Sequence, residues 1–240
     1  MKTIGLIGGT GWVSTQEYYK LINEKVNEKL GGLEFPRIVL VSVNYSDIYA
    51  CNQRNDREGV FRIIQNAAKT LEKAGVDFIA LCANTIHFTF DRLSQEINLP
   101  FLHIADAAAE SIRNQYISKV GLLGTMETME LDFYKKRLAL KGIDVITPEK
   151  SDREFIHNSI MNELLKEKFL PETKAGFIKI MDKLKDQGAR GMILGCTEIP
   201  LLIKTEDYNL PLFSTLEIHA AAIAEYALQD NDNLSFQNFY

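Results

Sequence analysis

The chain has 240 residues, of which 46% are apolar and 25% charged, a balance typical of a globular protein with one or two hydrophobic cores. Its net charge of −5 offers no basic field for nucleic acid or an anionic bilayer, so we expect neither as a partner. The start of the chain lacks the apolar run of a secretory signal, and three cysteines do not form a disulfide framework. We therefore expect a cytoplasmic protein with free thiols.

Short apolar runs of strand length recur along the chain, separated by longer segments of helical period. In chain order, the predicted strands are Ile4–Ile7, Ile38–Val43, Phe78–Cys82, Phe101–Ile104, Val120–Leu123, Met192–Leu194 and Leu212–Ser214. The first helix is predicted to begin at Ser14, which with Glu17 has the pattern of a capping box, and to end at Gly31-Gly32. Apolar strands joined by helices are typical of parallel sheets covered on both faces, so the predicted class is α/β.

The chain also resembles itself, because three sequence blocks recur in one order and at nearly one spacing. The pairs are Ile4–Gly8 with Val120–Gly124, the strand ends at Cys82 and Cys196, and Leu99–Asp106 with Leu210–Leu216. Convergence between unrelated strand-loop-helix units is the alternative explanation. The repeat favours two similar Rossmann-like domains related by a pseudo-twofold axis, with the first comprising residues 1–103 plus 214–240 and the second residues 104–213.

The glycine cluster after the first strand matches the common nucleotide-binding motifs only in part. The dinucleotide fingerprint fails at Ser14, and the next predicted strand is followed by Asn44 rather than an acidic residue. The P-loop pattern is also absent, whereas the phosphate loop of a nucleoside phosphorylase stays an open alternative. Backbone amides from Gly9 to Gly11 would suit a small anion such as a carboxylate, although a tight turn alone also explains the glycines.

Two cysteines, Cys82 and Cys196, end predicted strands and precede polar side chains at helix starts. A helix N-terminus lowers the pKa of a thiol, which predicts reactive cysteines, while the alternative is a small buried apolar side chain. Ligands of α/β sheets bind at the carboxyl ends of strands, so we expect an active site in the cleft between the two domains. Two acid/base groups on opposite faces of a carbon would invert its configuration. Cys51 lies in a polar stretch and is interpreted as incidental.

The motifs that carry a family resemblance are Gly8-Gly9, Ser14–Tyr19, Cys82–His87, Leu102–Asp106 and Gly195–Ile199. In them the chain resembles the aspartate/glutamate racemase family, close to the branch of broad-specificity amino-acid racemases. The resemblance implies racemisation of an amino acid without pyridoxal phosphate, with no cofactor and with Cys82 and Cys196 as the two bases. It also implies a homodimer and a C-terminal helix, about 216–228, that packs on the first domain.

The same resemblance implies that Asn84, Thr85 and Thr197 bind the carboxylate or amino group of the substrate. Gly9 and Thr10 are predicted to line the pocket, and because many relatives carry Met in place of Thr10, the side-chain specificity could differ here.

Further candidates for substrate binding are Gln53 and Lys166, for which a solvated side chain is the alternative. Glu198 could orient Cys196 or the ammonium group of the substrate, or could serve as a charge at a helix N-terminus. His87 could tune Cys82 or be structural. The Cys and His residues show no zinc-binding spacing, so no metal is expected. Alternative functions are a decarboxylase or isomerase of a small carboxylate on the same fold, or a non-catalytic amino-acid-binding protein.

Overall fold

The computed structural model describes residues 1–229, so residues 230–240 of the predicted first domain lie outside the described residues. The chain divides into two compact units, which are residues 1–104 together with 219 onward, and residues 105–218. The sequence placed the divisions after residues 103 and 213, at strand ends. Here the second division follows Ile218. The start of the last helix is bonded within the second unit, because Thr215 Oγ1 donates to Leu194 O at 3.0 Å.

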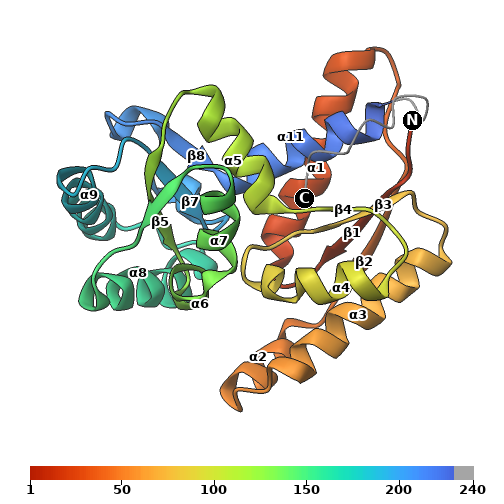
Figure 1. Cartoon of the computed structure of the whole chain (residues 1–240), viewed down its shortest axis with the longest axis horizontal. Coiled ribbons are helices and arrows are strands. Elements are labelled where there is room, and N and C mark those ends of the chain that lie inside the picture. Colours follow the sequence, from red (N-terminus) through yellow and green to blue (C-terminus); the bar gives the residue numbers. More distant parts are fainter. Residues whose placement is uncertain (230–240) are drawn as a thin grey trace. The chain divides into compact units, whose positions relative to one another are not determined.

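The first unit contains a parallel sheet of four strands in the order β2-β1-β3-β4 (Figure 1). The strands are β1 (Ile4–Gly8), β2 (Ile38–Ser42), β3 (Phe78–Leu81) and β4 (Phe101–Leu102). The α-helices are α1 (Trp12–Leu30), α2 (Tyr45–Gln53), α3 (Arg57–Lys73), α4 (Phe90–Glu96) and the part of α11 (Thr215–Leu228) from His219 onward. A short 3₁₀ helix, η1 (Thr85–Thr89), follows β3.

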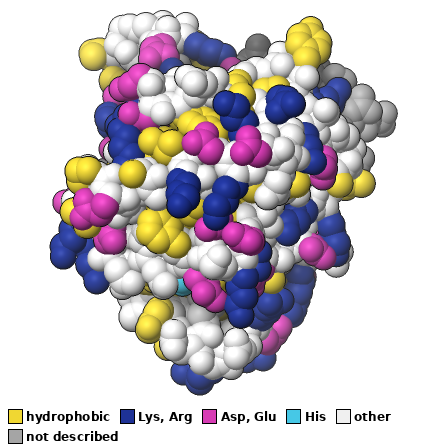
Figure 2. Space-filling view, turned by 90° about the vertical axis from the view of Figure 1, so that its left-hand side faces the viewer, with side chains coloured by type: hydrophobic (Ala, Val, Ile, Leu, Met, Phe, Trp, Pro, Cys, Tyr) yellow, Lys and Arg dark blue, Asp and Glu magenta, His cyan; other side chains and the backbone are white. Residues whose placement is uncertain are grey.

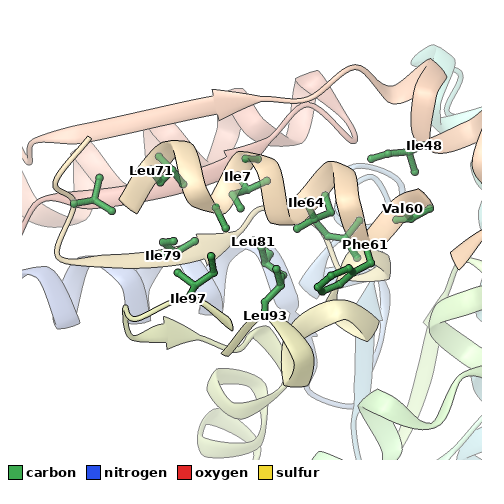
Figure 3. Close-up of a cluster of buried hydrophobic side chains, with 14 of the residues drawn as sticks. Ile7, Ile48, Val60, Phe61, Ile64, Leu71, Ile79, Leu81, Leu93 and Ile97 are labelled. Carbon is green, nitrogen blue, oxygen red and sulfur yellow. The ribbon is translucent and has the colours of Figure 1, made fainter. Parts of the chain in front are cut away.

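One core of this unit lies between α3 and the strands. Figure 3 shows Phe61, Ile64 and Leu71 of α3 directed toward Ile79 and Leu81 of β3. The alternate strand residues face the other way, where the Phe78 ring meets Tyr226 of α11 edge to face at 4.7 Å. Because both faces of the sheet are covered, its two central strands are apolar throughout and fully buried.

The start of α1 differs from the predicted capping box. The helix begins at Trp12, two residues earlier than expected, and its N-cap, Gly11, makes no side-chain cap. The hydroxyls of Ser14 and Thr15 instead donate to Gly11 O, each at 2.9 Å, so the capping prediction was wrong. The predicted end at Gly31 is confirmed, because Gly31 has a φ of 76° and its N–H donates to Asn27 O.

The second unit repeats the pattern with the strand order β6-β5-β7-β8, again all parallel. Its strands are β5 (Lys119–Gly124), β6 (Asp144–Ile146), β7 (Met192–Gly195) and β8 (Leu212–Ser214). Its α-helices are α5 (Ile104–Asn114) from Ala105 onward, α6 (Met126–Glu130), α7 (Asp132–Leu140), α8 (Lys150–Asn162), α9 (Pro171–Asp186), α10 (Ile199–Leu202) and the part of α11 up to Ile218. Two 3₁₀ helices complete it, η2 (Leu164–Lys166) and η3 (Thr205–Asp207).

The predicted α/β class with two similar parallel sheets is confirmed. Strand β6 was not predicted. It is three residues long, lies at a sheet edge and is only partly buried, so it lacks the apolar run that marked the other strands.

The surface carries charges of both signs. On the face shown in Figure 2, basic and acidic side chains are interspersed. Within residues 1–229, no helix is both long enough and apolar enough to cross a membrane.

Candidate active site

The carboxyl ends of β1 and β3 place Cys82 beside the glycine loop. The two strands pair in parallel with Ile7 opposite Leu81, and the Cys82 N–H donates to Ile7 O at 2.9 Å. Cys82 is thus held by backbone bonding next to Gly8, where the loop begins. The juxtaposition of these two sequence motifs follows from strand pairing alone.

The Cys82 thiol is fully buried, and burial raises its pKa far above the usual value. The sequence predicted the opposite direction, from a helix N-terminus. That prediction was wrong for the free protein because the element after Cys82 is the short 3₁₀ helix η1, whose dipole is small, while the thiol has no contact with solvent.

The glycine loop uses part of its own hydrogen-bonding capacity. Gly9 has a φ of 91°, and its N–H donates to Thr15 Oγ1 at 2.9 Å, so this amide is engaged within the loop. A Cβ at Gly9 would overlap the carbonyl oxygen of Val43. The Thr10 hydroxyl oxygen is buried and has no hydrogen-bond partner among residues 1–229. Thr10 Oγ1 is therefore a polar atom of this loop that a bound ligand could satisfy.

Asn84 and Thr85 lie directly after Cys82. Asn84 is buried at the start of η1, and Thr85, the first residue of η1, is partly exposed. Backbone connectivity thus brings these two predicted substrate-binding residues to the carboxyl edge of the sheet.

His87 bonds the loop that follows Cys82 to the backbone at the end of β4. The distance from Nδ1 to Ala83 O is 2.7 Å, and the Ile104 N–H donates to Nε2 at 3.2 Å. Because Nε2 accepts the Ile104 N–H, Nδ1 is the ring nitrogen placed to donate to Ala83 O. These bonds support the structural alternative for His87. Its ring also lies 4.6 Å from that of His103, yet no metal-binding group of three or more His, Cys, Asp or Glu exists in the described chain.

In the second unit, Cys196 follows β7 at the corresponding place. Gly124 at the end of β5 pairs with Gly195, and a Cβ on Gly195 would lie 2.8 Å from Leu123 O. The close approach of β5 and β7 therefore requires glycine immediately before this cysteine. Cys196 is partly exposed, in contrast to Cys82.

Cys196 has a charged partner. Its thiol donates to Glu198 Oε2 at 3.0 Å, and the Thr197 hydroxyl donates to the same oxygen at 2.7 Å. Glu198 is 6% exposed. Burial, followed by the negative charge and the hydrogen bond of Glu198, raises the pKa of Cys196 well above the usual value. Here too the predicted lowering was wrong, because an adjacent carboxylate disfavours a thiolate.

Gln53 and Lys166 are placed differently from the other candidates. Both are exposed, Gln53 at the end of α2 and Lys166 at the end of η2. Within the described chain, no hydrogen bond or ion pair joins either side chain to the loops that follow the cysteines.

Two residues that sequence reasoning did not assign to the site support its loops. Thr15 bonds the Gly9 amide, and His157 Nδ1 accepts from the Met126 N–H at 3.2 Å, just after β5. Thr15 lies in the Ser14–Tyr19 motif, which the sequence analysis interpreted only as the start of a helix. His157 gave no signal in the sequence, because it comes from a helix distant from the loop in the chain.

Comparison with known proteins gives consistent matches over most of the chain. A family model described as Asp/Glu/hydantoin racemase matches residues 7–223. The broad-specificity amino-acid racemase RacX of Bacillus subtilis is 25% identical over 215 residues, which cover 88% of this chain and 92% of RacX. Crystal structures match as well. A candidate Asp/Glu racemase from Yersinia pestis is 44% identical with a TM-score of 0.90, over 95% of this chain and 100% of that one. An aspartate racemase homologue from Pyrococcus horikoshii is 39% identical with a TM-score of 0.84, over 95% of this chain and 100% of that one.

Proposed function

The chain belongs to the Asp/Glu/hydantoin racemase family, and we propose that it racemises a free amino acid by two-base proton transfer between Cys82 and Cys196. The observation that carries the proposal is the matched placement of the two cysteines. Each directly follows a central strand of a parallel sheet, beside a loop that begins with glycine at the end of the neighbouring strand. The substrate class is supported by the broad-specificity racemase and the aspartate racemase homologue among the relatives.

In this mechanism one cysteine, as thiolate, removes the α-proton from one face of the substrate. The electron pair of the broken C–H bond passes to the α-carbon and its carboxylate, and the second cysteine, as thiol, delivers a proton to the opposite face. The product is the enantiomer, and the protonation states of the two sulfurs are exchanged. The mechanism requires both sulfurs at one substrate, and it needs no cofactor.

The developing charge on the substrate carboxylate requires fixed donors. We assign this role to Asn84, Thr85 and Thr197, with the Thr10 hydroxyl, which has no partner within residues 1–229, as a further donor. Gly9 would then shape the loop, because its amide is already bonded to Thr15. Gln53 and Lys166, both exposed, would reach the substrate side chain.

The raised pKa values of both thiols fit this chemistry when the substrate itself is counted. An amino acid brings an ammonium group next to the sulfurs, and a nearby positive charge favours a thiolate. Thiolate formation would therefore be coupled to substrate binding. A cytoplasmic location and a homodimer stay predictions.

The test is incubation of the pyridoxal-free protein with a panel of amino acids in D2O, aspartate and glutamate included. The measurements are α-proton exchange by NMR and enantiomer ratio by chiral chromatography. We expect exchange with inversion for at least one substrate. Absence of exchange across the panel would overturn the proposal and favour a decarboxylase, another isomerase or a binding protein.

A further inference from the structure

The loop after β5 is supported by a histidine that comes from α8. Met126 lies two residues beyond Gly124, the last residue of β5, and its N–H donates to His157 Nδ1 at 3.2 Å. Gly124 pairs with Gly195, the residue before Cys196. The imidazole therefore stands at the carboxyl edge of the second sheet, at the end of the strand that neighbours β7.

The helix that carries His157 is firmly packed in the second unit. Ile156 and Ile160 are fully buried in the core of this unit. A Cβ added at Gly176 of α9 would lie 2.5 Å from the Phe155 ring of α8, so the two helices approach each other closely. His157 is thus held on a rigid element, as a group that selects a ligand has to be.

The second ring nitrogen of His157 is available to a ligand. A ring that accepts at Nδ1 donates through Nε2. Nε2 makes no hydrogen bond within residues 1–229, and it is not one of the buried atoms of these residues that lack a partner. This nitrogen is therefore open to solvent, although the side chain as a whole is partly buried. His157 thus presents one N–H donor at the carboxyl edge of the sheet.

The corresponding support in the first unit has no such spare atom. There the Gly9 N–H donates to Thr15 Oγ1, and the same hydroxyl donates to Gly11 O. Thr15 is 5% exposed, so its hydroxyl is both bonded and enclosed. Of the two supporting side chains, His157 is the one that keeps a donor for another molecule.

We infer that His157 determines substrate specificity, because its Nε2–H binds the substrate side chain and favours side chains that end in an oxygen acceptor. The inference rests on the proposed function, since its ligand is the amino acid assigned there. Gln53 and Lys166, proposed for the same side chain, are exposed, whereas His157 is bonded to the loop after β5. A single N–H donor binds a carboxylate oxygen or an amide oxygen, so the substrate class includes asparagine as well as aspartate.

Two substitutions separate the Nε2 donor from the loop bond. In His157→Asn, the Oδ1 atom takes the position of Nδ1 and accepts from the Met126 N–H, but no donor reaches the position of Nε2. In His157→Gln, the longer side chain returns an amide donor near that position. Asn158→Ala, at an exposed position of the same helix, is the matched control.

The first measurement is kcat/KM for racemisation of aspartate, asparagine and leucine, whose side chains are similar in size. We expect His157→Asn to lower kcat/KM about tenfold for aspartate and asparagine and less than about twofold for leucine, which is the effect of one hydrogen bond. His157→Gln should recover most of this loss, and Asn158→Ala should match wild type. Equal losses for all three substrates would mean that His157 only supports the loop, and would overturn the inference. Unchanged values for aspartate and asparagine would overturn it too.

The second measurement needs no turnover. The ring signals of nitrogen-15-labelled histidine are recorded by NMR as aspartate, asparagine or leucine is added, and His157→Asn identifies the signal of His157. We expect Nε2 to shift with aspartate and asparagine but not with leucine. If this shift occurs and wild type inverts no amino acid, the proposed function fails while the binding role of His157 stands. If the signal does not respond to aspartate or asparagine, the inference is overturned even where racemisation is observed.

Discussion

The two units share one strand order and differ in how each treats its buried polar groups. In both, a cysteine follows the central strand that pairs with the first strand of the unit. Cys82 has no contact with solvent, and burial alone shifts its pKa, whereas Cys196 is partly exposed and bonded to Glu198. The repeated fold thus places a cysteine at the same position in each unit, and the residues around each cysteine determine the pKa of its thiol.

A second difference concerns two fully buried tyrosines. The Tyr18 hydroxyl on α1 pairs with His219 Nδ1 at 3.0 Å, while the Tyr134 hydroxyl on α7 has no hydrogen-bond partner among the described residues. Burial, together with the Asp106 carboxylate, raises the pKa of Tyr134. The buried Tyr18 hydroxyl of the first unit thus has a hydrogen-bond partner, whereas the buried Tyr134 hydroxyl of the second unit has none among the described residues.

The largest effect is expected from removing either thiol. Cys82→Ala and Cys196→Ala should each reduce racemisation by roughly 1,000-fold or more, because each variant lacks one of two obligatory proton-transfer groups. The measurement is the enantiomer ratio over time. Cys51→Ala is the matched control, since Cys51 packs in the core of the first unit and should leave turnover unchanged. Equal activity of wild type and either single variant would contradict the two-base mechanism.

A large effect on stability is expected at Gly9. Gly9→Ala should lower the free energy of unfolding by about 3 kcal/mol, because its φ of 91° is strained for alanine and the added carbon would overlap Val43 O. Gly31 has a similar φ of 76°, but a Cβ added there would meet no atom within 4 Å. Gly31→Ala should therefore lower the free energy of unfolding by only about 1 kcal/mol. Gly124, at the end of β5 in the second unit, has no positive φ. Its Cβ would lie 3.0 Å from Gly195 O, so Gly124→Ala should fall between the two.

Urea denaturation followed by circular dichroism measures all three variants. Equal losses for Gly9→Ala and Gly31→Ala would show that the contact with Val43 does not matter.

The strands and the location of both cysteines could be predicted because apolar runs and strand ends are local properties of the sequence. Strand β6 was not predicted because Asp144–Ile146 is short and partly exposed, so it has no apolar run. The direction of the thiol pKa shifts could not be predicted, since it depends on complete burial at Cys82 and on where the Glu198 carboxylate points. The capping box predicted at Ser14 was wrong because the Ser14 and Thr15 hydroxyls donate to the carbonyl oxygen of Gly11 instead of accepting from helix amides.

A third prediction concerns acid sensitivity of the first unit. Burial lowers the pKa of His219 to about 4, from an ordinary value near 6.5 in the unfolded chain. The unfolded state therefore binds the proton first as pH falls, and the stability contributed by neutral His219 is complete above pH 6.5 and lost toward pH 4. The loss between pH 7.5 and pH 5 should be about 2 kcal/mol.

The check is the urea midpoint of wild type and His219→Gln at both pH values. The variant should be less stable at pH 7.5, because the bond to Tyr18 is altered, but should lose about 2 kcal/mol less on acidification. Parallel losses in the two proteins would place the acid sensitivity elsewhere.

The smallest effect, and the one with a change of sign, is expected from the two tyrosines. Tyr18→Phe should lower the free energy of unfolding by about 1 to 2 kcal/mol, because it leaves buried His219 Nδ1 without its donor. Tyr134→Phe removes a buried hydroxyl that has no partner among residues 1–229, so stability should stay the same or rise by up to about 1 kcal/mol. Urea denaturation at pH 7.5 compares the two. A loss at Tyr134 equal to that at Tyr18 would mean that water or Asp106 satisfies the Tyr134 hydroxyl, and that the two units treat their buried tyrosines alike.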